Sequence, residues 1–155
     1  MYDVDSSDEV VPLTTLPQCD PGAPLPCVAA AEHVLRVAYI TLGDGSDADA
    51  IVTVSFERPY AHMFGPPNDE AFHGHPLADR GLTPYGVFRI DHSSWLRRLE
   101  RMNSVHPQHD PDAFEQLHHF VLSFHDSTFE CVAHAFDHVT TPANGVFTLS
   151  VEIHP

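Results

Sequence analysis

The chain has 155 residues, with 22 acidic residues against seven Arg and no Lys, and its net charge is −15 with His neutral. This charge argues against nucleic acid and anionic membranes as partners, because both are bound through clusters of cationic side chains. The length suits one domain, no segment is long and apolar enough to span a bilayer, and the acidic start is unlike a signal peptide, so we expect a single-domain cytoplasmic protein.

Residues 1–29 are predicted to form a disordered or extended acidic arm. They contain five Pro and five acidic residues and show no periodic apolar pattern. Apolar side chains between residues 10 and 16 would allow the arm to pack along the domain or along a partner. We place a single α+β domain at residues 30–155.

Two strands joined by a turn open the predicted domain. Residues 33–42 are rich in β-branched and aromatic side chains, residues 43–50 have a turn composition, and residues 51–57 alternate between apolar and polar side chains. These segments predict an antiparallel hairpin. A long connection follows at residues 58–84, and ordered loops of this length are often functional. A third strand is predicted at residues 85–91.

Two helices are predicted after the third strand. Ser93 or Ser94 caps the first, and apolar side chains recur at helical spacing over its next turns. The second begins at Asp110, which is followed by Pro at the first helical position, and it ends near residue 117.

The remaining segments predict strands at residues 119–125, 128–136 and 146–153, where apolar side chains alternate with polar ones. The helices interrupt the strands once and do not alternate with them. This order favours an α+β fold with a mostly antiparallel sheet of about six strands and one or two helices packed on one face.

The long connection carries a candidate metal site. Thirteen His is a high number for this length, and two of them, His73 and His75, stand two residues apart. In an extended segment both imidazoles point the same way, and Asp79 follows four residues later. Two His and one carboxylate are the ligands of a facial triad, which suits Fe for redox chemistry or Zn for hydrolysis. The alternative is that these His side chains hold the loop through hydrogen bonds.

Five residues of this region, Gly65, His73, His75, Asp79 and Gly86, resemble the first motif of the cupins, in which a Gly, a His-x-His pair, a Glu and a second Gly follow one another. The chain departs from that motif in having Asp for Glu, a longer first spacer and four Pro. No second cupin motif follows. The resemblance covers 22 residues, so we carry over neither the cupin fold nor a cupin activity.

The hairpin at residues 118–131 offers a second candidate site. With a two-residue turn at 126–127, His125, Glu130 and His134 share one face of the sheet. They would bind a metal, or Glu130 would act as a general base with His125 as its partner. The alternative is an ordinary polar face of an antiparallel sheet.

Two functions from different classes follow. The first is a binding or accessory module whose acidic surface meets a basic protein partner. The second is a small Fe- or Zn-dependent enzyme that uses the His-x-His loop. Stoichiometric metal and stabilisation by that metal would separate the second from the first.

Overall fold

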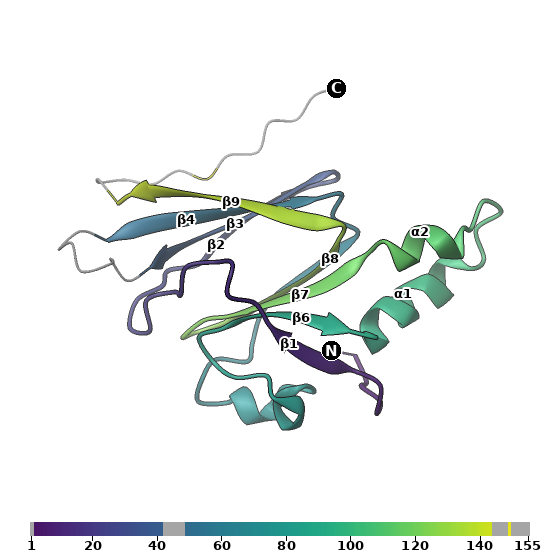
Figure 1. Cartoon of the computed structure of the whole chain (residues 1–155), viewed down its shortest axis with the longest axis horizontal. Coiled ribbons are helices and arrows are strands. Elements are labelled where there is room, and N and C mark those ends of the chain that lie inside the picture. Colours follow the sequence, from purple (N-terminus) through teal and green to yellow (C-terminus); the bar gives the residue numbers. More distant parts are fainter. Residues whose placement is uncertain (1, 42–48, 144–148, 150–155) are drawn as a thin grey trace.

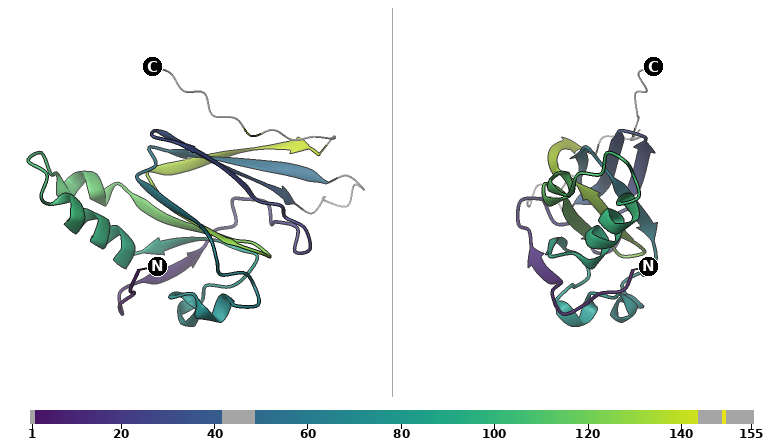
Figure 2. Two further views of the ribbon diagram at one scale, coloured as in Figure 1. Left: turned by 180° about the vertical axis from the view of Figure 1, so that it is seen from behind. Right: turned by 90° about the vertical axis from the view of Figure 1, so that its right-hand side faces the viewer.

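The computed structural model of the protein describes residues 2–41, 49–143 and 149. Within this part of the chain, nine strands form two antiparallel sheets, and two α-helices lie at one end of the molecule (Figures 1 and 2). The predicted α+β class with mostly antiparallel strands and one or two helices is confirmed, although the described strands form two sheets and not the single sheet of about six strands that we expected. The predicted strand at 146–153 and most of the 43–50 turn lie outside the described residues.

One sheet has five strands in the order β1-β6-β7-β8-β5. Its strands are β1 (Glu9–Pro12), β5 (Ala61–Gly65), β6 (Val87–Asp91), β7 (His118–Ser123) and β8 (Thr128–Ala133). The other sheet has four strands in the order β2-β3-β4-β9. Its strands are β2 (Cys27–Ala31), β3 (Val34–Thr41), β4 (Ala50–Glu57) and β9 (Ala135–Pro142).

The described part of the N-terminal arm is extended and contributes to both sheets. Strand β1 pairs with β6, and β2 pairs with β3, although both strands begin before residue 30, where we predicted the domain to start. Asp8 also accepts a hydrogen bond of 2.6 Å from the backbone N–H of Ser94, at the start of the first helix. Strand β1 has only four residues, too few to give a periodic signal in the sequence.

The long connection is more ordered than its Pro and Gly content indicates. It contains the edge strand β5 and two short 3-10 helices, η1 (Phe72–Gly74) and η2 (Ala78–Arg80). Strand β5 has the sequence AHMFG, which lacks the β-branched residues that mark strands, so the sequence does not reveal it. The two 3-10 helices lie against the face of the five-stranded sheet that points away from the four-stranded sheet (Figure 1).

Both predicted helix starts are confirmed. Helix α1 (Ser94–Asn103) is capped by Ser93, whose side chain accepts a hydrogen bond from the N–H of Leu96. Helix α2 (Pro111–Glu115) is capped by Asp110 and has Pro in its first turn. A side-chain oxygen at the cap satisfies a backbone N–H that the helix itself leaves without a partner.

Two apolar cores lie on the two faces of the five-stranded sheet. The first fills the space between the sheets, where Phe56 of β4 packs on Phe129 of β8 with ring centroids 5.5 Å apart. The second covers the outer face and is closed by the arm, the 3-10 helices and α1; there, Tyr2 stacks on Trp95 at 5.6 Å. Residues that alternate along β7 and β8 therefore point into two different cores.

Candidate functional site

A buried carboxylate lies at the centre of the second core. Glu130, on β8, is only 4% exposed. It accepts a hydrogen bond of 2.6 Å from the hydroxyl of Tyr2, and it lies 2.9 Å from Nε2 of His119 and 3.3 Å from Nε2 of His75. His119 in turn contacts Ser93. We call these five residues the buried cluster.

The other ring nitrogens of the two His side chains indicate where their protons lie. Nδ1 of His75 accepts the backbone N–H of Leu77 at 3.2 Å, so Nε2 carries the proton and donates to Glu130. Nδ1 of His119 lies 2.9 Å from the hydroxyl of Ser93, which has a proton to donate to it. In this arrangement every polar group of the buried cluster has a partner.

Burial and hydrogen bonding act in opposite directions on Glu130. Burial raises the pKa of its carboxyl, but hydrogen bonds from its three partners, His119 foremost, lower the pKa more, from the ordinary 4.5 to about 2. Burial, followed by the charge of Glu130, raises the pKa of Tyr2 above its usual range. The carboxylate therefore stays ionised and the phenol protonated, as their hydrogen bond requires.

Of the three predicted metal ligands, only His75 joins this cluster, because the segment is not extended. His73 lies in the 3-10 turn of η1 and His75 is the extended residue that follows it, so the two side chains do not share a face as they would in one extended strand. His73 and Asp79 are exposed, whereas His75 is buried. In the chain as far as the structure describes it, no three His, Cys, Asp or Glu side chains come together as a metal-ligand set.

A second cluster lies at the other end of the β7–β8 hairpin. Nδ1 of His125 is 3.0 Å from a carboxylate oxygen of Asp69, and the hydroxyl of Tyr85 donates a hydrogen bond to that same oxygen. The hydroxyl of Tyr85 is also 3.0 Å from Nδ1 of His125. We call these three residues the rim cluster. Its side chains are partly open to solvent: 39% of His125 and 19% of Asp69 are exposed.

Backbone contacts fix the geometry of the rim cluster. The N–H of Asp69 donates to the carbonyl of His125 at 2.9 Å, so the two residues are joined through both main chain and side chain. Tyr85 has a φ of 60°, a conformation that is rare for an aromatic residue. The hydrogen bond from Tyr85, followed by that from His125, lowers the pKa of Asp69, and the same Asp69 contact raises the pKa of Tyr85 to about 12.

These contacts leave one nitrogen of His125 open. In the neutral imidazole whose Nδ1 donates to the Asp69 carboxylate, Nε2 carries the lone pair, and Nε2 has no hydrogen-bond partner among the described residues. An imidazole held by a carboxylate at one nitrogen and open at the other is the arrangement of a general base.

Tyr85 also forms part of the wall of a cavity of about 350 Å³ between the two sheets. Most of the wall is apolar, with Leu16 from the arm and Leu122 from β7, and Ser123 contributes a hydroxyl. The Cys19 thiol lies in the same wall, and burial raises its pKa to about 11, so it remains a neutral thiol. The rim cluster thus stands beside a mainly apolar cavity.

The predicted pairing of His125 with Glu130 is wrong. A two-residue turn would pair Ser123 with Glu130, but Ser123 pairs with Thr128, and Glu130 pairs with Val121. The N–H of Phe124 bonds to the carbonyl of Ser127, which places His125 in the loop and not in the strand. Glu130 therefore points into the second core, while His125 reaches Asp69.

The third member of the predicted face, His134, belongs to neither cluster. Strand β8 ends at Ala133 and β9 begins at Ala135, so the predicted strand at 128–136 crosses from one sheet to the other at His134. Its backbone N–H donates to the carbonyl of Glu57 at 3.0 Å.

Sequence reasoning did not assign five of the eight residues of the two clusters to a site, and one of the five, Ser93, was predicted only as a helix cap. His119 begins the strand predicted at 119–125 but is not among the predicted site residues. Asp69 lies in the long connection that was singled out as functional, which was the available signal for it. Tyr2 and Tyr85 carry no local pattern, since only the folded chain brings them to their partners.

In comparisons with known proteins, no family model, no curated protein and no solved structure matches this chain. Among the described residues, the longest helix has ten residues, and none is long and apolar enough to cross a membrane.

Proposed function

We propose that the protein binds a small, mainly apolar molecule in the cavity between its sheets and that His125, oriented by Asp69, accepts a proton at the rim. The observation that carries this proposal is the rim cluster: an imidazole bonded to a carboxylate, with its second nitrogen open, next to a residue that forms the cavity wall. Tyr85 links the two, because it contacts both His125 and the cavity.

The cavity has the properties of a small-molecule site. Its volume of about 350 Å³ lies at the lower end of the range for ligand pockets, and apolar walls with a few polar groups are usual in such sites. The hydroxyl of Ser123 donates to the carbonyl of Thr83 at 2.8 Å and accepts from the N–H of Gly86 at 2.9 Å, so this part of the wall is fixed before a ligand arrives.

A neutral fluorescent probe, 1-aminoanthracene, tests the binding step. We expect its emission to rise when it binds to the wild type. Thr14 is exposed and lies in the cavity wall, so Thr14→Trp should block entry and abolish most of the signal without disturbing the core. Thr15→Trp is the matched control, since Thr15 is exposed but does not line the cavity. Equal binding by both variants would count against this cavity as the site.

Carbethoxylation with diethyl pyrocarbonate tests the proton-transfer step. The reagent modifies unprotonated imidazole nitrogens, so the open Nε2 of His125 should react readily, and bound 1-aminoanthracene should slow the reaction. His106, which is exposed and remote from the cavity wall, serves as the internal control. If the probe binds but leaves the reaction at His125 unchanged, the binding proposal stands and the assignment of His125 fails.

A module for a basic protein partner is the second candidate. Strand β5 is an edge of the five-stranded sheet, and Phe64 on it is 46% exposed, so an incoming strand could pair there and cover it. The net charge of −15 favours a basic partner. This reading is supported if the wild type retains a partner that salt releases and that Phe64→Asp does not retain. Equal retention of the partner by Phe64→Asp would exclude the β5 edge.

Elemental analysis of untagged, chelator-free protein directly tests the Fe- or Zn-dependent enzyme that the His-x-His loop predicts. His73 and Asp79 are exposed, so the His73→Ala/Asp79→Ala variant should fold normally. Near-stoichiometric metal that disappears in this variant would revive the metal proposal. An absence of metal from both proteins would end it.

A further inference from the structure

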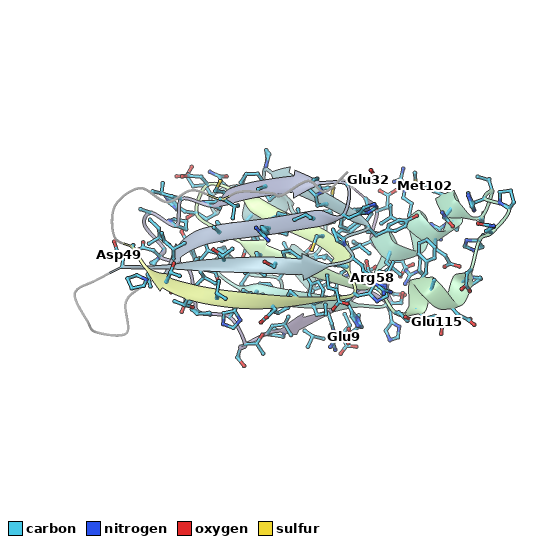
Figure 3. All side chains as sticks on the ribbon, turned by 90° about the horizontal axis from the view of Figure 1, so that it is seen from above. Glu9, Glu32, Asp49, Arg58, Met102 and Glu115 are labelled. Atoms are coloured by element: carbon cyan, nitrogen blue, oxygen red, sulfur yellow. The ribbon has the colours of Figure 1, made fainter. Side chains whose placement is uncertain are left out.

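A second hollow lies at the end of the molecule near α2, where the chain crosses twice between the sheets. Residues 58–60 join β4 to β5, and His134 joins β8 to β9. Together with His33, Phe114 and Leu117, these segments enclose a volume of about 390 Å³. Figure 3 places Arg58 at the end of the four-stranded sheet that faces the helices. The residues of this hollow are separate from those of the inter-sheet cavity.

Apart from Tyr60, the ionisable side chains that line the hollow are all basic. They are Arg58, His33 and His134, and the described lining contains no Asp or Glu. This is unusual in a chain with 22 acidic residues and seven Arg. Within the described residues Arg58 has no hydrogen bond or ion pair, whereas Arg89 and Arg97 bond to Asp91 and Asp5. The guanidinium of Arg58 is therefore available to an anion.

The rest of the wall is apolar and aromatic. Phe114 is buried, and Tyr60 packs on it edge to face with ring centroids 5.1 Å apart. Leu117 and Ala113 extend this surface. A ligand with an apolar body could bury that body here while its charged end remained near the cations.

The walls are held in place by the backbone. The N–H of Tyr60 donates to the carbonyl of Val132 at 2.7 Å, and the N–H of His134 donates to the carbonyl of Glu57 at 3.0 Å. Both crossing segments are therefore tied to neighbouring strands. A preformed site loses less conformational freedom on binding than one that must be ordered by its ligand.

We propose that this hollow is a binding site for a small organic carboxylate with an aromatic or aliphatic body. The guanidinium of Arg58 pairs with the carboxylate, since its fork of donors matches the two oxygens, and the imidazoles of His33 and His134 supply further donors. The body of the ligand packs against Phe114 and Leu117. The charge and the apolar surface of the hollow together favour such an acid over a neutral ligand or an inorganic anion.

Calorimetry with 4-phenylbutyrate and with its neutral amide tests this site in the full-length protein. We expect the acid to bind at least tenfold more tightly than the amide and than inorganic phosphate. Arg58→Gln should weaken binding of the acid at least tenfold. Arg98→Gln is the matched control, because it removes the same charge from another exposed Arg that lies outside the hollow, and it should leave binding unchanged.

Three outcomes would overturn the proposal. The acid and the amide could bind equally, both Arg variants could weaken binding to the same extent, or the acid could fail to bind at concentrations up to about 10 mM. Thr14→Trp separates this site from the inter-sheet cavity, since it should leave binding of 4-phenylbutyrate intact. Thermal unfolding of Arg58→Gln confirms that the variant is folded in every case.

Discussion

The buried cluster and the rim cluster contain the same kinds of side chain, namely carboxylate, imidazole and tyrosine, but they differ in what their hydrogen bonds leave open. In the buried cluster every polar group has a protein partner, and Glu130 is 4% exposed. In the rim cluster Nε2 of His125 has no partner among the described residues. Hydrogen bonds that satisfy every polar group of a buried cluster stabilise the fold. An imidazole nitrogen without a protein partner, close to the surface, is instead suited to accept a proton from a ligand.

Removing the central carboxylate should give the largest effect. Glu130→Ala leaves two imidazoles and a phenol buried without their acceptor, and breaking a buried charged network costs about 3–5 kcal/mol. Urea denaturation measures the loss in the free energy of unfolding. Glu70→Ala removes an exposed carboxylate and should change stability by less than about 0.5 kcal/mol. A loss below about 1 kcal/mol for Glu130→Ala would contradict the assigned role of the buried cluster.

Acid should weaken the buried cluster through Glu130 itself. Its folded-state pKa of about 2 lies below the ordinary value of 4.5, so its stabilising contribution is complete above pH 4.5 and is lost as the pH falls towards 2. A difference of this size corresponds to a contribution on the order of 3 kcal/mol. The free energy of unfolding measured between pH 6 and pH 2.5 should fall more steeply in the wild type than in Glu130→Gln. Parallel curves would contradict the assignment.

Loss of one donor should have a smaller effect. Tyr2→Phe keeps the stacking on Trp95 but removes the hydrogen bond to Glu130, at a cost of about 1–3 kcal/mol. The arm should then open more often, and limited proteolysis should cut it faster. Tyr60→Phe serves as the control, because no hydrogen bond of the Tyr60 hydroxyl occurs among the described residues. Equal rates of cutting in both variants would show that Tyr2 does not anchor the arm.

The rim cluster should tolerate change best. Asp69→Asn removes the carboxylate from a partly exposed contact with His125, and such contacts contribute about 1 kcal/mol or less to stability. The same variant should nevertheless slow carbethoxylation of His125, because the amide no longer holds the imidazole with Nε2 open. A variant that loses much stability and keeps its reactivity would reverse the contrast between the two clusters.

The sequence predicts well what local interactions decide. Ser93 and Asp110 cap their helices as predicted, since a cap depends on residues a few positions away. The hairpin of β3 and β4 likewise follows from alternation and a turn composition. In each case the residues that determine the structure lie close together in the sequence, within one helix start or one hairpin.

The candidate sites could not be predicted in the same way, because they depend on register and on distant segments. A shift of the β7–β8 turn from two residues to a longer loop separates His125 from Glu130 and changes the partners of both. Tyr2 and Glu130 are 128 positions apart, and nothing near either residue indicates the other. The long connection supplies residues to both clusters, but η1 ends between His73 and His75, so only His75 is buried.

The separation of 128 positions between Tyr2 and Glu130 also determines how long after Tyr2 the ribosome adds Glu130. A chain grows at roughly 5–20 residues per second, so about 6–26 s pass between the synthesis of the two residues. During this interval the newly made arm lacks the carboxylate to which it bonds, and β1 waits roughly 4–16 s for its partner strand β6. The arm is thus made some seconds before the residues that hold it, and for that time it is open to any protein that recognises an extended acidic segment.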